Sequence, residues 1–181
     1  MKQRLSVVVL SMLVAVAVAP GSALADKLRF QASFAVGLSV TPNSPPVSYC
    51  GGPAQDLKVE GHGSGFSSLG ALAFSLNKTI SAGVMHGCLT LNTPNGDNLF
   101  ATYDAVEGEG NANNFNTTKS GRLIFTGGTG LFKGAKGMAT FTAVFDGLYP
   151  ASSFFSGTGA APFQVMGFYV IDGSLFAGRS D

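Results

Sequence analysis

Apolar and polar residues alternate with a period of two along much of this chain. The clearest case runs from Leu28 to Val40, where one face of the segment is apolar and the other is polar or small. The apolar positions are Phe30, Ala32, Phe34, Val36, Leu38 and Val40. A period of two is that of a β-strand with one buried face, so this segment is predicted to be a long first strand.

Shorter runs of the same kind follow at regular spacing. Further strands are predicted at Asp56–Phe66, around Leu72, Phe74 and Leu76, at Val84–Leu91 and at Leu99–Tyr103. Asn95-Gly96-Asp97 supplies a tight hairpin turn between the last two. The second run carries Gly61, Gly63 and Gly65 on one face, which indicates either a sharp bend or a neighbour packed closely over the backbone.

The stretch from Ser120 to Gly147 contains two alternating runs around a glycine-rich turn. Leu123 and Phe125 share a face before the turn. Ala139, Phe141, Ala143 and Phe145 share a face after it. The turn glycines are Gly127, Gly128, Gly130, Gly134 and Gly137, and their density predicts a structural turn with positive φ angles or close backbone approaches.

The remaining segments are loops and one last strand. Loops are predicted at Thr41–Pro53, which contains four prolines, at the polar Glu107–Lys119 and at Leu148–Pro162. Phe163–Ile171 is predicted to be a strand that is apolar on both faces, so it should also be covered on the outside. Eight strands without an amphipathic helix predict one all-β domain, an eight-stranded antiparallel barrel whose closure removes exposed edges.

The N-terminal residues have the pattern of an export signal. A basic start at Lys2 and Arg4 precedes an apolar run from Leu5 to Ala19 and an A-x-A ending at Ala25. The apolar run is short for a membrane span, so residues 1–25 are predicted to be a signal peptide and 26–181 the secreted barrel domain, extracellular or periplasmic. No membrane span is expected after its removal.

Charge and composition limit the classes of molecule that the protein is expected to bind. The whole chain has a formal net charge of +1. Removal of the two cations of the signal leaves a net charge of −1 without a basic stripe, so neither nucleic acid nor an anionic membrane is expected as a partner. Fifteen phenylalanines in so short a chain must either fill an interior or lie against copies of the protein.

The glycine-rich turn also carries a family resemblance. F-T-G-G-T-G-L-F-K-G-A-K-G resembles the G-G-T-G-x-F-x-G-A-x-G signature of dirigent proteins, allene oxide cyclases and small secreted bacterial proteins of the same barrel type. Residues 61–70 and 91–99 resemble the family segments G-x-G-x-A-T-H-L-G and L-x-x-x-N-G-D-x-L. The resemblance covers residues 58–147.

The resemblance implies a calycin-like barrel and, because dirigent proteins and allene oxide cyclases are trimers, a homo-oligomer. It does not select a function, since the family includes enzymes, chirality-directing proteins and members without known activity. Phe66-Ser67-Ser68 replaces A-T-H, so no role of the family histidine carries over, and Leu131 replaces the usual Arg or Lys.

The two cysteines, Cys50 and Cys88, are expected to pair in an exported chain. The alternative is two independent buried thiols.

Motifs for familiar chemistry are missing from the sequence. Gly127-Gly128-Thr129-Gly130 lacks the spacing of a phosphate-binding loop, and no G-x-S-x-G elbow occurs. His62 and His86 lack zinc-ligand spacing, and Asp104, Glu107 and Glu109 lack calcium-loop spacing and are predicted to form a solvated loop rim. We expect neither a metal nor a cofactor.

Three hypotheses for function remain. The first is a non-catalytic barrel that binds a small apolar molecule or a surface partner. The second is an isomerase, cyclase or dirigent-type protein that holds a reactive apolar intermediate in one conformation. The third is a solid barrel with a structural or assembly role. The candidate residues for a ligand pocket in the interior are Glu60, His62, Tyr103, Arg122, Phe141 and Phe145.

Overall fold

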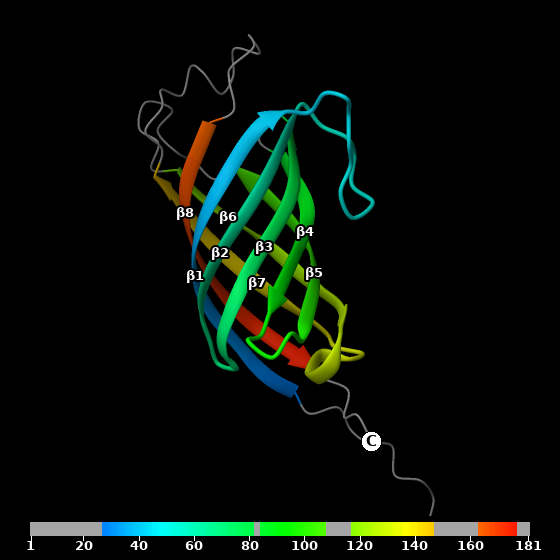
Figure 1. Cartoon of the computed structure of the whole chain (residues 1–181), viewed down its shortest axis with the longest axis vertical. Coiled ribbons are helices and arrows are strands. Elements are labelled where there is room, and N and C mark those ends of the chain that lie inside the picture. The colour runs from blue at the N-terminus through cyan, green and yellow to red at the C-terminus, as the bar shows by residue number, and fades with distance from the viewer. Residues whose placement is uncertain (1–26, 82–83, 108–116, 147–162, 177–181) are drawn as a thin grey trace, which may run out of the picture.

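The chain folds into a closed antiparallel barrel of eight strands (Figure 1). The structure is a computed structural model, and it describes residues 27–81, 84–107, 117–146 and 163–176. Each strand is hydrogen-bonded to the strands before and after it in the sequence, and the last strand closes onto the first. The predicted fold class is therefore confirmed. The predicted signal peptide and the predicted loop Leu148–Pro162 lie outside the described residues.

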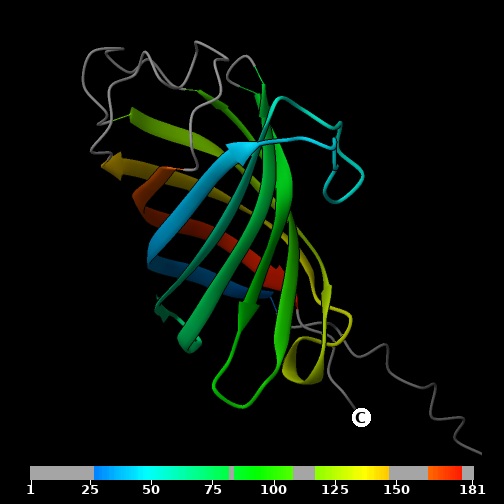
Figure 2. The ribbon, with the colours of Figure 1, turned by 45° about the horizontal axis from the view of Figure 1, so that its top comes forward.

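The elements follow the predicted order. The strands are β1 (Lys27–Pro42), β2 (Leu57–Ser67), β3 (Gly70–Ser81), β4 (Val84–Asn92), β5 (Asn98–Glu107), β6 (Thr117–Gly128), β7 (Lys136–Asp146) and β8 (Phe163–Phe176). One 3-10 turn, η1 (Gly130–Phe132), lies between β6 and β7. Figure 2 shows η1 in yellow at one end of the barrel and the β1–β2 connection in cyan at the other.

Several boundaries differ from the prediction; for example, β1 continues to Pro42, within the predicted loop Thr41–Pro53. The predicted loop Glu107–Lys119 is too long, because Glu107 ends β5 and residues 117–119 begin β6. Lys119 pairs with Glu107, and Thr117 pairs with Phe145, so backbone hydrogen bonding continues although the sequence there is polar. β8 continues past Ile171 to Phe176 because it pairs with both β7 and β1 over that length.

The inward faces of the strands form one core. All six apolar positions of the first predicted strand are buried, with at most 7% of any of them exposed. In β2, a Cβ atom on Gly63 or Gly65 would collide with the backbone carbonyl of Ala35 or Ser33 in β1. These glycines therefore mark a close approach of two strands, one of the two interpretations of their spacing.

The glycine-rich turn closes one end of the barrel. Gly127, Gly130, Gly134 and Gly137 have φ angles of 154°, 52°, 72° and 151°, which confirms the predicted positive values. The tight path turns Phe132 and Ala135 into the core, where they are 1% and 0% exposed, whereas Leu131 points outward. This glycine-rich turn thus covers one end of the core.

Candidate functional site

The interior of the barrel is filled by aromatic rings that contact one another. The ring centroids are 5.1 Å apart for Phe34–Phe74, 5.1 Å for Phe74–Tyr169, 6.0 Å for Phe141–Tyr169, 4.6 Å for Tyr103–Phe141 and 5.7 Å for Phe145–Tyr169. The rings come from β1, β3, β5, β7 and β8, so the cluster links opposite walls of the barrel. Such pairs add stabilisation beyond the area they bury.

A lysine lies within this aromatic interior. Lys78 is on the inward face of β3 and is only 2% exposed. Its Nζ donates to Tyr103 Oη at 3.5 Å and lies 3.6 Å from Met85 Sδ. The ammonium also lies 5.2 Å from the ring centre of Tyr103 and 5.4 Å from that of Phe145. Lys78, Tyr103 and Tyr169 make up what we call the lumen cluster.

A glycine on the next strand lies directly beside the lysine. Gly87 lies opposite Lys78 in β4 and also pairs with Tyr103 in β5. A Cβ atom on Gly87 would lie 2.2 Å from the Asn77 carbonyl oxygen and 2.5 Å from Lys78 Cβ, so only glycine fits there. Strands β3 and β4 therefore approach each other closely at Lys78, and the ammonium reaches the phenol of Tyr103 on the strand beyond.

Burial changes the acidity of the two phenols. Burial raises the pKa of Tyr103 well above its ordinary value, and the neighbouring Tyr169 hydroxyl raises it further. Burial also raises the pKa of Tyr169, an effect that the Tyr103 hydroxyl partly offsets. Both phenols therefore remain neutral at physiological pH. An amine beside two neutral phenols can hold a carbonyl or an anionic group and can move a proton.

The residues of the lumen cluster are nevertheless inaccessible to solvent in the structure. Tyr103 and Tyr169 are each 1% exposed, Phe141 is 2% exposed and Phe145 is 6% exposed. Side chains this inaccessible leave no surface against which a ligand could lie. In the described part of the barrel, the interior is a packed core.

The structure divides the six predicted pocket residues into two groups. Tyr103, Phe141 and Phe145 are buried in the interior. Glu60, His62 and Arg122 do not, because they lie on the outer surface of the barrel. The reason is strand parity, since Val59, Gly61 and Leu123 occupy the inward positions next to them. Glu60 instead pairs with Lys58 at 3.3 Å.

Two members of the lumen cluster were missed. Lys78 follows Leu72, Phe74 and Leu76 at the same parity, so the alternation already placed a cation on the inward face of β3. Tyr169 gave no such signal, because Phe163–Ile171 is apolar on both faces and its inward side cannot be chosen from the pattern.

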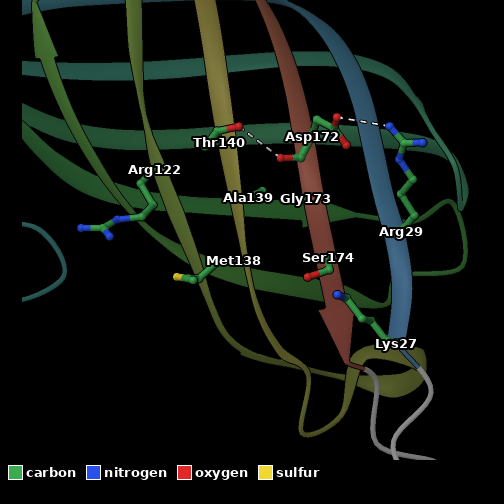
Figure 3. Close-up of a pocket in the computed structure, with 9 residues that line it drawn as sticks. All are labelled: Lys27, Arg29, Arg122, Met138, Ala139, Thr140, Asp172, Gly173 and Ser174. Carbon is green, nitrogen blue, oxygen red and sulfur yellow. Dashed lines mark hydrogen bonds and ion pairs between the residues drawn. The ribbon is translucent and has the colours of Figure 1, made fainter.

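Two grooves formed by described residues lie on the outer surface. The first is lined by Arg122, Met138, Thr140, Asp172, Ser174, Arg29, Lys27 and the backbone of Ala139 and Gly173, and has a volume of about 640 Å³ (Figure 3). The second, of about 510 Å³, has a floor of small residues of β1, β2 and β3 and is bordered by Phe66 and Phe168. Arg122 thus lines a groove, although not the interior pocket for which it was a candidate.

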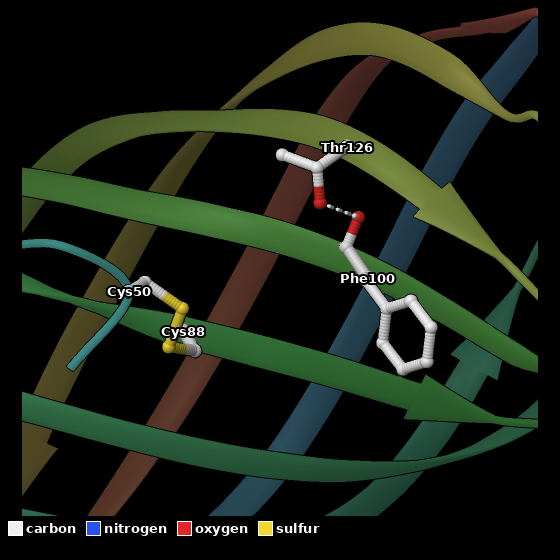
Figure 4. The surroundings of a disulfide bond; sticks show 4 residues. All are labelled: Cys50, Cys88, Phe100 and Thr126. Carbon is white, nitrogen blue, oxygen red and sulfur yellow. Dashed lines mark hydrogen bonds between the residues drawn. A yellow bond between two sulfur atoms is a disulfide. The ribbon is translucent and has the colours of Figure 1, made fainter.

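The two cysteines form a disulfide, as predicted (Figure 4). Their Cα atoms are 5.6 Å apart, and Cys50 belongs to the β1–β2 connection whereas Cys88 is in β4. The same connection is hydrogen-bonded to β3, where Thr79 Oγ1 donates to the Pro53 carbonyl at 3.0 Å. The disulfide therefore fixes a proline-rich loop to the outside of the barrel.

The remaining ionisable residues within the described ranges do not assemble a metal centre. His86 Nδ1 contacts Asp104 Oδ1 across the outer faces of β4 and β5, so Asp104 lies within a strand and not on the predicted loop rim. Among the described residues, no group of three His, Cys, Asp or Glu side chains could hold a metal ion. The described residues also include no helix long and apolar enough to cross a membrane.

Comparison of the chain with protein-family models, with curated proteins and with solved structures gives no match.

Proposed function

We propose that this protein is a secreted, non-catalytic barrel that works through its outer surface and associates there with copies of itself. The observation that carries the proposal is the composition of β8. Its inward face completes the packed core with Val165, Tyr169, Ile171 and Leu175, and its outward face is apolar from Met166 to Val170. An apolar outer strand on a closed barrel is explained by a partner that covers it.

The packed interior supports a surface function over binding in the lumen. A small apolar ligand needs a concave site that covers most of its surface. The aromatic rings of the described interior already occupy that space and contact one another. This favours the surface-partner and assembly hypotheses over the hypotheses that place a ligand inside.

Five of the exposed large apolar residues lie on the outer faces of β7, β8 and β2, of which β8 and β2 flank β1. We call the set Phe66, Val144, Met166, Phe168 and Val170 the β8 face; their exposed fractions are 75%, 43%, 58%, 51% and 49%. Strand pairing brings them together. Val144 lies opposite Phe168, and Val170 lies opposite Ser33, which in turn lies opposite Phe66.

The β8 face has a shape that suits a second copy. Met166, Phe168 and Val170 form a ridge along β8, whereas the adjoining outer positions of β1 are the small residues Ser33, Ala35 and Gly37. The groove of about 510 Å³ lies over this floor, between Phe66 and Phe168. A ridge next to a groove on one chain lets the ridge of one copy enter the groove of another.

The apolar area is also of the right size. A standard interface buries about 800 Å² on each partner, of which about 65% is apolar in homodimers. The five side chains of the β8 face together expose roughly 500 Å² of apolar surface, given that one fully exposed aromatic side chain contributes about 200 Å². The face therefore supplies the apolar part of one standard interface.

Two features support secretion. The N-terminal residues have the pattern of a signal peptide. The Cys50–Cys88 disulfide is the kind of cross-link that persists in an oxidising compartment.

Sedimentation velocity of the mature protein at micromolar concentration tests self-association. We expect an oligomer, with a trimer as the stoichiometry that the family resemblance implies. Phe168→Glu should weaken association by about a hundredfold or more, because it places an unpaired carboxylate in the middle of the β8 face. Leu131→Glu is the matched control, since Leu131 is 59% exposed and lies outside that face. A mature protein that is only monomeric, or equal effects of the two variants, would contradict the proposal.

The lumen cluster gives one specific reason to test the rival hypothesis of a ligand or reaction inside the barrel. An amine near two phenols is chemically competent, so accessibility decides the matter. Acetylation of the native protein followed by peptide mass spectrometry should modify the exposed Lys136 far faster than Lys78. Modification of both at similar rates would show that the interior opens, and would favour the ligand hypotheses.

A further inference from the structure

The first of the two outer grooves gathers positive charge on a protein of low net charge. We call it the basic groove; it is lined by Lys27 and Arg29 of β1, Arg122 of β6 and a single carboxylate, Asp172 of β8 (Figure 3). Lys136, at the start of β7, adds a cation close by, since it pairs with Phe176, which pairs with Lys27. Most other described acidic side chains are on the opposite wall, from β2 to β5 and the connections next to it; they are Asp56, Glu60, Asp97 and Asp104.

The cations remain available to a ligand. Arg29 Nη2 lies 3.4 Å from Asp172 Oδ2, but the two side chains are 70% and 54% exposed. An ion pair this exposed contributes little to stability. An anionic ligand can therefore bind Arg29 beside Asp172 or in its place. Arg122 points away from Arg29 in Figure 3, so the two guanidinium groups do not converge on one point.

The spacing of the cations selects an extended ligand. Arg122 on β6 and Arg29 on β1 are separated by β7 and β8, hence by three strand spacings, or about 14 Å between their backbones. A single small anion could contact only one of them closely. A chain with anionic groups at intervals could contact both.

The other groups that line the basic groove favour a ligand that also carries hydroxyl groups. Asp172 offers a carboxylate acceptor between the cations, and Thr140 and Ser174 offer hydroxyl groups. Thr140 Oγ1 donates to the Asp172 carbonyl at 3.3 Å and not to its carboxylate, so the exposed carboxylate is shared between Arg29 and any donor that a ligand brings. A ligand made only of anionic groups would be repelled by this carboxylate, whereas sugar hydroxyls would donate to it.

We propose that the basic groove binds an acidic oligosaccharide, a sugar chain that carries carboxylate or sulfate groups together with free hydroxyls. The 55% exposed Met138 provides an apolar surface for the C–H faces of the sugar rings. None of the nine lining residues is aromatic, which favours a sugar over a single-stranded nucleic acid, whose bases stack on aromatic rings. The basic groove shares no residue with the β8 face, so this inference does not rest on self-association.

Binding is tested with four fluorescent probes of equal length at low and at physiological salt. The probes are an oligogalacturonate octamer, a heparin-derived octasaccharide, neutral maltooctaose and single-stranded dT8. The mature protein should bind the first two, with affinity that falls as salt rises. Arg29→Gln/Arg122→Gln should weaken binding by about tenfold for each arginine removed. Lys58→Gln/Lys133→Gln changes the net charge equally outside the groove and should leave the affinity within about twofold.

Asp172→Asn separates a sugar site from plain charge attraction. Charge alone predicts tighter binding after the substitution, because a negative charge is lost. Hydrogen bonds from sugar hydroxyls to the carboxylate predict weaker binding of the oligogalacturonate, although the protein becomes more positive. The Phe168→Glu variant should bind the probes as the unchanged protein does, so a failure of self-association and a failure of sugar binding remain distinguishable.

Each of four outcomes would overturn the proposal. They are no binding of either acidic oligosaccharide at low salt, equal losses in the two double variants, binding of dT8 as tight as that of the acidic sugars, and tighter sugar binding by Asp172→Asn. Thermal melting of every variant checks that the exposed substitutions leave the barrel folded.

Discussion

At the scale of single residues, the unusual feature is polar chemistry inside an aromatic core. Lys78, Tyr103 and Tyr169 are each at most 2% exposed. A buried ionisable group must be hydrogen-bonded, paired or neutral. The two phenols satisfy this by remaining protonated, since burial raises the pKa of both. The stability of the barrel should therefore depend on pH in the alkaline range.

We expect the free energy of unfolding to fall as the pH rises above about 10, the pKa of an unperturbed phenol. The unfolded chain then releases protons that the folded chain retains at Tyr103 and Tyr169, and this favours the unfolded state. The contribution is complete below that pH and is lost as the pH rises toward the raised native pKa values, with a slope of about 1.4 kcal/mol per pH unit for each phenol.

Urea denaturation at several alkaline pH values, with the unchanged protein and with Tyr103→Phe/Tyr169→Phe, measures this slope. The variant should lose the part of the slope that belongs to the two phenols. An identical slope in both proteins would show that neither phenol remains protonated in the folded state.

At the scale of elements, the pairing of β1 with β2 shows how one strand can have different requirements on its two sides. Inside, β2 approaches β1 so closely that only glycine fits at Gly63 and Gly65. Outside, a Cβ atom on Gly37 of β1 would make only ordinary contacts, at 3.9 Å from the His62 carbonyl and 4.0 Å from Met166 Sδ. Glycines on the two faces of this pair should therefore respond oppositely to the same substitution.

Gly65→Ala should lower the free energy of unfolding by about 2 kcal/mol or more, because the added methyl group collides with the Ser33 backbone in a close-packed core. Gly37→Ala is the matched control and should raise it by up to about 1 kcal/mol, because it restricts the unfolded chain without a clash. Chemical denaturation of both variants measures the pair. Equal effects would mean that the two strands can separate at little cost.

At the scale of the whole molecule, the barrel is held closed by pairing between the two ends of the chain. β8 pairs with β1 from Phe176 opposite Lys27 to Phe163 opposite Val40, so the last strand must find the first before the barrel is complete. Contacts of such long range make folding slow and raise its entropic cost. The Cys50–Cys88 disulfide, with a sequence separation of 38, lowers part of that cost in the first half of the chain.

Cys50→Ala/Cys88→Ala should lower the free energy of unfolding by about 4 kcal/mol, the chain-entropy value for a loop of this length. Urea denaturation gives the difference, and reduction of the unchanged protein serves as a second route to the same loss. A double variant as stable as the unchanged protein would show that the disulfide does not restrict the unfolded chain.

The outer surface of the barrel also has two chemically different regions along β8, one apolar and one charged. The β8 face occupies one part of β8, from Met166 to Val170, and the basic groove occupies the next, from Asp172 to Ser174. Association through the first would place several basic grooves on one assembly. An acidic sugar chain could then contact more than one of them, and its apparent affinity would rise through multivalency.

The sequence was a good guide to the fold because a strand records its burial in a period of two. The alternation in β1 and β7 and the turn at Gly96 each correspond to one local feature of the structure. It was a weaker guide to the site. Parity alone could have excluded Glu60 and Arg122 from the interior and placed Lys78 there, but it could not decide the inward side of β8.

The sequence by itself thus determined the strand order, the closing turn and the pairing of the two cysteines, because each depends on residues close in the chain or on a single possible partner. Only the tertiary structure decided that the described part of the lumen is packed, that Lys78 meets Tyr103, and that Arg29, Arg122 and Asp172 share one groove. These features bring together strands far apart in the sequence, and the register that sets them is fixed only when the barrel closes.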